Sequence, residues 1–105
     1  MNQVASEGMD TMEDRTQLVE KEFEITNRLG LHARAAAQLV QLANKYVSEI
    51  RIIKNGIDVN AKSIMGVLML AAPRESKILL RADGPDAADA IEAIGQLIER
   101  KFGEE

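Results

Sequence analysis

Polar and hydrophobic residues alternate in four short stretches of the chain, which is the pattern of half-buried β-strands. In the first stretch, Phe23 and Ile25 alternate with Glu and Thr residues, and the other three stretches span 49–52, 57–61 and 78–82. Asn55-Gly56 separates the second stretch from the third, and both residues tolerate the positive φ angles of a tight hairpin turn. The pattern therefore predicts four strands, of which the middle two form a hairpin.

Hydrophobic residues at helical spacing separate these strands and predict three helices. The first helix begins near His32 or Ala33, in an Ala-rich run that favours helix formation. Its hydrophobic stripe comprises Ala36, Leu39, Val40, Ala43 and Val47. The second helix is short, from Ile64 to about Leu70, and Ser63 is suited to cap its N-terminus.

The third helix follows a chain break at Gly84-Pro85, with Asp86 as its expected N-cap and Asp89 in its first turn. Its hydrophobic stripe comprises Ala87, Ala90, Ile91, Ile94, Leu97, Ile98 and Phe102. The resulting order, β-α-β-β-α-β-α, predicts a two-layer α+β domain in which three helices cover one face of a four-stranded antiparallel sheet. Periodicity alone does not separate this fold from a ferredoxin-like β-α-β-β-α-β unit with an added helix.

The chain has 105 residues, which suits one small domain, and its formal net charge of −4 is unevenly distributed. Residues 1–20 carry five acids and one arginine without sustained periodicity, so we expect a disordered acidic leader there and a folded domain over 21–105. Met9 and Met12 lie within that leader, so a start later than Met1 is an alternative that the sequence leaves open. Residues 21–82 have an excess of five positive charges, which favours a phosphate or an acidic partner.

The composition argues against several kinds of site. The chain has no cysteine and one histidine, so we expect neither disulfides nor a metal site. No stretch approaches the roughly 20 apolar residues that span a bilayer, and residues 1–20 lack the pattern of a signal peptide. Basic clusters interleaved with aromatic residues, which would suggest nucleic-acid binding, are missing too. We therefore expect a cytoplasmic monomer that uses no cofactor.

The single histidine, His32, lies where the first helix is predicted to begin, after a Gly30-Leu31 loop. A helix start leaves N–H groups without internal partners, and together with the helix dipole they form an anion site. A phosphoryl group on the imidazole would be such an anion, near the backbone of Ala33 and Arg34 and near the Arg34 guanidinium. Because phosphoryl transfer depends mainly on positioning and charge stabilisation, this pattern predicts a phosphoryl carrier rather than an enzyme.

Two motifs resemble those of HPr, the histidine-containing phosphocarrier of bacterial phosphoenolpyruvate-dependent phosphotransferase systems. The first reads Asn27-Arg-Leu-Gly-Leu-His-Ala-Arg-Ala-Ala-Ala-Gln-Leu-Val, and the second reads Lys62-Ser-Ile-Met-Gly-Val-Leu-Met-Leu. Asn55-Gly56 also falls where this family turns between its second and third strands. The resemblance covers residues 21 to about 102, and it implies the HPr-like open-faced β-sandwich instead of the ferredoxin-like alternative.

The resemblance also implies the roles of individual residues and partners. Enzyme I would phosphorylate Nδ1 of His32, Arg34 would assist, and an enzyme IIA-type protein would receive the group. Ser63 would be a regulatory phosphorylation site for an HPr kinase/phosphorylase. One departure is Ala35, where HPr proteins commonly have proline; Ala at this position is similar to relatives in regulatory branches, including nitrogen-type systems. The downstream output, sugar uptake or regulation, therefore stays open.

The short helix after Ser63 is also expected to contribute a docking face. A helix of barely two turns cannot bury every side, so we expect Val67 and Leu70 to lie mainly inside the protein. Three of its hydrophobic residues, Ile64, Met65 and Leu68, are then expected to be partly exposed and to contact partner proteins, because exposed Met and Leu side chains suit varied partners.

The leading hypothesis is thus a phosphocarrier that accepts a phosphoryl group on His32. The alternative is a regulatory interaction module that is controlled by phosphorylation of Ser63. A small-molecule-binding domain of the ferredoxin-like type would explain neither motif.

Overall fold

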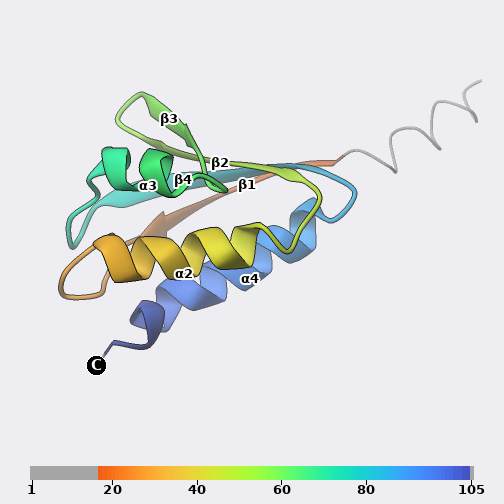
Figure 1. Ribbon diagram of the computed structural model, residues 1–105. Helices are drawn as coiled ribbons and strands as arrows, with labels where there is room; N and C mark the ends of the chain where they lie inside the picture. The colour runs from red at the N-terminus through yellow and green to blue at the C-terminus, as the bar shows by residue number, and fades with distance from the viewer. Residues whose placement is uncertain (1–16, 105) are drawn as a thin grey trace, which may run out of the picture.

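Seven regular elements and a final 3₁₀ turn follow one another in the computed structural model, which describes residues 17–104 (Figure 1). They are β1 (Gln17–Glu24), α2 (Ala33–Ala43), β2 (Glu49–Lys54), β3 (Ile57–Asn60), α3 (Ile64–Leu70), β4 (Lys77–Gly84), α4 (Ala87–Glu99) and η1 (Lys101–Gly103). This order confirms the predicted β-α-β-β-α-β-α arrangement. Among the described residues, no helix is long and apolar enough to cross a membrane.

The four strands form one sheet in the order β1-β4-β2-β3, and all three neighbouring pairs are antiparallel. The register places Phe23 opposite Ile78 and Ile52 opposite Leu80, so hydrophobic side chains meet across the strands. A ferredoxin-like sheet also has antiparallel neighbours only, because another strand lies between the two parallel strands of each split β-α-β unit, so strand direction does not separate the two folds. They differ in strand order: a ferredoxin-like sheet has its first and third strands in the centre, whereas here β1 and β3 are the edge strands and β4 and β2 lie between them. The observed order confirms the HPr-like arrangement.

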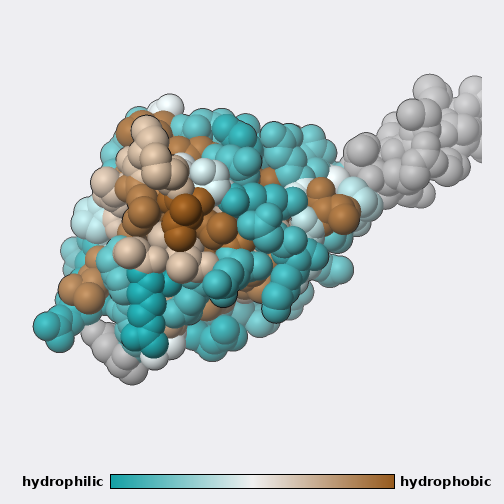
Figure 2. Space-filling view, in the orientation of Figure 1, coloured by the Kyte–Doolittle hydropathy of each residue, from teal (hydrophilic) through white to brown (hydrophobic). Residues whose placement is uncertain are grey.

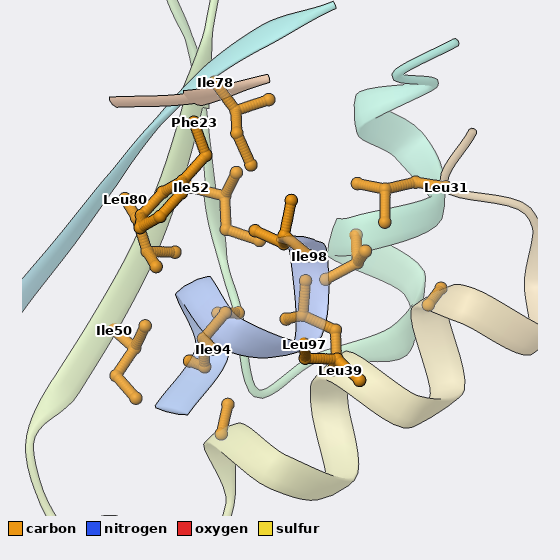
Figure 3. Close-up of a cluster of buried hydrophobic side chains, with 14 of the residues drawn as sticks. Phe23, Leu31, Leu39, Ile50, Ile52, Ile78, Leu80, Ile94, Leu97 and Ile98 are labelled. Carbon is orange, nitrogen blue, oxygen red and sulfur yellow. The ribbon is translucent and has the colours of Figure 1, made fainter. Parts of the chain in front are cut away.

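The helices and the sheet enclose one hydrophobic core. Helices α2 and α4 lie side by side below the sheet in Figure 1, α4 packs against β1 and β4, and α3 packs against α2 and β3. The close contact between α4 and β1 requires Gly95, because a Cβ there would lie 2.5 Å from the Phe23 ring. Figure 3 shows side chains from both layers, including Ile50, Leu80 and Ile94, pointing toward one another.

The folded region begins earlier than the sequence pattern predicted. Strand β1 starts at Gln17, so the last four residues of the predicted leader 1–20 belong to the sheet, and Glu20 Oε2 lies 2.6 Å from Arg81 Nε. The prediction was wrong here because β1 is an edge strand with largely exposed side chains, which weakens the hydrophobic alternation. The rest of the predicted leader lies outside the described residues.

Two helix ends also differ from the predictions. Helix α2 ends at Ala43 because Asn44 closes it, with its N–H bonded to carbonyls of the last turn and Nδ2 2.9 Å from Val40 O. Val47 therefore lies beyond the helix and is 74% exposed instead of buried. At the other end of the chain, α4 stops at Glu99, and Phe102 reaches the core from η1 through a left-handed φ of 57°.

The N-cap predictions had different outcomes at α3 and α4. Ser63 Oγ accepts a hydrogen bond from Gly66 N at 3.1 Å, so the predicted cap of α3 is confirmed. Asp86 precedes α4, but its carboxylate makes no cap bond. It accepts instead from the N–H groups of Val47 and Ser48 at 3.0 Å each and from Ser48 Oγ at 2.5 Å. The side chain of Asp86 thus fastens the α2–β2 loop to the start of α4.

Candidate functional site

His32 is the N-cap residue of α2, with the extended backbone angles typical of that position (φ −76°, ψ 179°). The first helical hydrogen bond runs from Ala36 N to His32 O at 2.8 Å. The N–H groups of Ala33, Arg34 and Ala35 precede that bond and have no acceptor within the helix. The imidazole makes no cap hydrogen bond to them. The start of α2 is therefore suited to an anion attached to the ring.

The loop before His32 is fixed by backbone contacts. Gly30 has a φ of 69°, and a Cβ at this position would lie 2.5 Å from Ala72 O and 2.9 Å from Pro73 Cα. Leu31 N donates to Ala72 O at 2.9 Å, which ties the loop to the chain that leaves α3. The buried Leu31 side chain anchors the loop in the core (Figure 3). These contacts determine where the imidazole of His32 lies.

Glu104 contacts His32 from the opposite end of the chain. Its carboxylate oxygen Oε2 is hydrogen-bonded to Nε2 of the imidazole, and Oε1 accepts from Asn27 Nδ2 at 3.2 Å. The hydrogen bond with His32 is the main cause of a lowered pKa of the Glu104 carboxyl, opposed by its partial burial and supported by Asn27 and by the positive charge of Arg34. Glu104 is therefore an ionised carboxylate at neutral pH.

The His32 ring opens onto a surface depression of about 300 Å³, lined by Arg28, Leu29, His32, Arg34 and Glu104. The His32 side chain is 26% exposed, so a partner protein has access to it. Arg34, in the first turn of α2, and Arg28, in the preceding loop, place two guanidinium groups around the depression. No group of three or more potential metal ligands is present in the part of the chain that the structure describes.

The structure places the other predicted residues on a neighbouring surface. Ser63 is half-buried at the start of α3, and the next residues of this helix are exposed. The exposed fractions of the predicted docking residues are 41% for Ile64, 68% for Met65 and 40% for Leu68, while Val67 and Leu70 are buried, all as expected. Met69, 71% exposed, is a further hydrophobic residue of α3, and Leu29, 64% exposed, lines the depression at His32. Figure 2 shows hydrophobic residues gathered over α3.

Three residues of the site were not predicted from the sequence as functional: Glu104, Asn27 and Arg28. Glu104 is separated from His32 by 72 residues, and the predicted helix through Phe102 gave no indication that the chain turns back. Asn27 is fully buried, donates to Gly30 O at 2.7 Å and supports Glu104. For Asn27 and Arg28, the only sequence signal of a role in the site was that both are polar and lie in the loop before His32.

Comparison with known proteins agrees with this geometry. A family model described as the PTS HPr component phosphorylation site matches residues 19–100. A phosphocarrier protein HPr of Cupriavidus necator is 49% identical over 87 residues, covering 83% of this chain and 98% of that protein. A second, from Xylella fastidiosa, is 47% identical over 88 residues, covering 84% of this chain and 99% of the relative. The crystal structure of HPr-C-His from Thermoanaerobacter tengcongensis is similar with a TM-score of 0.81 and 48% identity, covering 83% and 98% of the two chains.

Proposed function

This chain belongs to the HPr family of phosphocarriers of the phosphotransferase system, and from that premise we propose that enzyme I phosphorylates it on Nδ1 of His32. The phosphoryl group is then passed to an enzyme IIA-type acceptor. In each step, a bond between phosphorus and the incoming atom forms as the bond to the donor breaks, and no group remains on the carrier at the end. The chain therefore acts as a carrier rather than as a catalyst.

One observation carries this proposal: an accessible imidazole lies at a helix start whose first N–H groups have no helical acceptor. Glu104 contacts Nε2, so the other ring nitrogen, Nδ1, has no hydrogen-bond partner among the described residues. Arg34 lines the same depression and offers a permanent positive charge to a phosphoryl group. These are the positioning and electrostatic elements that phosphoryl transfer requires.

The direct test is incubation with phosphoenolpyruvate and an enzyme I preparation that is proven active on another HPr. We expect one phosphoryl group per chain, labile in acid and stable in base, located on His32 by mass spectrometry. His32→Ala should abolish labelling, and Arg34→Ala should slow it, whereas Lys45→Ala serves as the charge control, because Lys45 is exposed and lies just beyond the C-terminal end of α2, away from His32. An unlabelled wild-type chain beside a labelled reference HPr would contradict the proposal.

The exposed hydrophobic residues of α3 are proposed as the docking face for both partners. Ile64, Met65 and Leu68 lie on the helix whose following segment is tied to the His32 loop by the hydrogen bond from Leu31 N to Ala72 O, so a protein that covers α3 also reaches the imidazole. Met65→Ala and Leu68→Ala should each lower the transfer efficiency by about fivefold or more, the effect of losing about 1 kcal/mol of binding. Leu18→Ala is the control, because Leu18 is 61% exposed but lies on β1.

Regulatory phosphorylation of Ser63 is a second candidate function, supported by the position of Ser63 beside this docking face. A phosphate at a helix start is electrostatically tolerated, yet it would add about two negative charges next to Ile64 and Met65. Ser63→Asp should therefore keep α3 capped and weaken docking of enzyme I. Unchanged phosphoryl transfer to Ser63→Asp would remove the support for such regulation.

The output of the carrier is either sugar uptake or a regulatory branch. Offering phosphorylated His32 to enzyme IIA-type proteins of both kinds tests this, because the protein that accepts the phosphoryl group identifies the output.

A further inference from the structure

We infer that Glu104 is a positioning residue for phosphoryl transfer: its carboxylate holds the neutral His32 ring in the tautomer whose lone pair lies on Nδ1. This inference rests on the proposed function and adds a residue from the C-terminal segment to the site. It explains which of the two ring nitrogens is available to attack phosphorus.

The first step of the argument concerns protons. An ionised carboxylate has no hydrogen to donate, so in its contact with Glu104 the Nε2 atom of His32 must be the donor. A neutral imidazole carries a single N–H, and when that hydrogen is on Nε2 the lone pair is on Nδ1. The contact with Glu104 therefore determines the nucleophilic nitrogen without touching it.

The second step concerns how firmly the carboxylate is placed. Phe102 is 2% exposed and fixes η1 in the core, and the left-handed conformations of Lys101, Phe102 and Gly103 turn the chain back toward α2. Asn27 then holds the second carboxylate oxygen of Glu104 while its own amide also donates to Gly30 O. The Glu104 side chain is only 16% exposed. The carboxylate is therefore held from two sides and does not depend on a single contact.

The third step concerns charge during the reaction. As the Nδ1 lone pair forms the bond to phosphorus, the electron pair of the breaking bond stays on the donor, and the imidazole gains positive charge. The hydrogen on Nε2 remains between the ring and Glu104, whose negative charge stabilises the developing cation. A carboxylate that orients an imidazole and stabilises its cationic form has the same role in serine hydrolases. We therefore expect Glu104 to affect the rate of transfer more than the binding of enzyme I.

The test combines ring NMR with transfer kinetics on three variants. Nitrogen-15 NMR of unphosphorylated wild type, at a pH where the ring is neutral, should place the hydrogen on Nε2, and Glu104→Ala should give a mixture of tautomers. With enzyme I, Glu104→Ala should lower kcat by about tenfold or more while KM changes little. Glu104→Asp should recover part of the rate. Glu99→Gln, on the exposed surface of α4, is the matched control and should behave as wild type.

The outcomes separate this inference from the proposed function. A wild-type ring with its hydrogen on Nδ1, or a Glu104→Ala rate within twofold of wild type, would overturn the role of Glu104 and leave the carrier function standing. A wild-type chain that enzyme I does not phosphorylate would overturn the carrier function, and the NMR result would then still report the tautomer. Circular dichroism of each variant confirms that the comparison is made between folded proteins.

Discussion

The starts of α2 and α3 contrast in how the N-cap side chain is used. At α3, Ser63 Oγ accepts a hydrogen bond from Gly66 N, so the cap residue satisfies its own helix. At α2, the imidazole of His32 makes no such bond and is held on its other side by Glu104. The two positions look alike in sequence, because a polar residue precedes a hydrophobic run in both. The difference is that α2 keeps its N–H groups available for a ligand, whereas α3 uses one of them for stability.

The contrast suggests a general criterion for reading helix starts. A cap residue whose side chain is engaged by its own helix adds stability, typically about 1 kcal/mol. A cap residue whose side chain is positioned by a distant segment leaves an anion site open. The largest expected effects should therefore come from changes that displace the start of α2, and the smallest from changes that only stiffen it.

Gly30→Ala is expected to have the largest effect, because it strains the loop that places His32. The substitution introduces a Cβ against backbone atoms of Ala72 and Pro73 at a φ of 69°, which should destabilise the fold by about 2–5 kcal/mol. Gly56→Ala is the matched control, since Gly56 has a φ of 82° but nothing within 4 Å, and should cost about 1–2 kcal/mol. Equal losses in urea unfolding would contradict the steric argument.

Asp86→Asn is expected to have the next largest effect and tests a third way of using a cap residue. The hydrogen bond from the Ser48 hydroxyl, supported by those from the N–H groups of Val47 and Ser48, holds the pKa of Asp86 below its ordinary value of 3.8, against the opposing effect of desolvation. A carboxyl whose pKa is lower in the folded state than in the unfolded state stabilises the protein at pH values above its unfolded-state pKa. This contribution is lost as the pH falls through the folded-state pKa. Wild type should therefore exceed Asp86→Asn in stability at pH 7, and the gap should narrow below about pH 4. Asp89→Asn is the control, and a gap that does not change with pH would count against this explanation.

Ser63→Ala should have a moderate effect confined to stability. Loss of the bond to Gly66 N is expected to lower the free energy of unfolding by about 1 kcal/mol. Phosphoryl acceptance by His32 should remain, because the start of α2 is untouched. Chemical denaturation and enzyme I kinetics on the same sample check both statements, and a transfer defect as large as that of Arg34→Ala would erase the contrast between the two helix starts.

Ala35→Pro should have the smallest effect, and it should be stabilising. Ala35 lies in the first turn of α2, where its N–H precedes the first helical hydrogen bond, so proline removes no bond of the helix. The restricted unfolded chain should add about 0.4–1 kcal/mol to stability. Thermal unfolding measures the gain. Destabilisation would show that the buried position, where Ala35 is 0% exposed, has no room for the proline ring.

Local sequence signals predicted the features that local physics determines. The alternation around Ile52, the cap at Ser63 and the position of His32 before an Ala-rich helix all correspond to the structure. The edge strand at Gln17–Glu20 was missed because exposed edge residues carry little hydrophobic pattern. Glu104 was missed for a different reason: its contact with His32 depends on how α4 and η1 pack, which no local pattern records.

The central claim is that the start of α2 receives a phosphoryl group on one defined nitrogen of His32. Phosphorus-31 NMR of the chain, phosphorylated by enzyme I and uniformly labelled with nitrogen-15, measures this directly through the coupling between phosphorus and the ring nitrogen. The account predicts a single phosphohistidine in which phosphorus is bonded to Nδ1. Phosphorus bonded to Nε2, or to a residue other than His32, would contradict it.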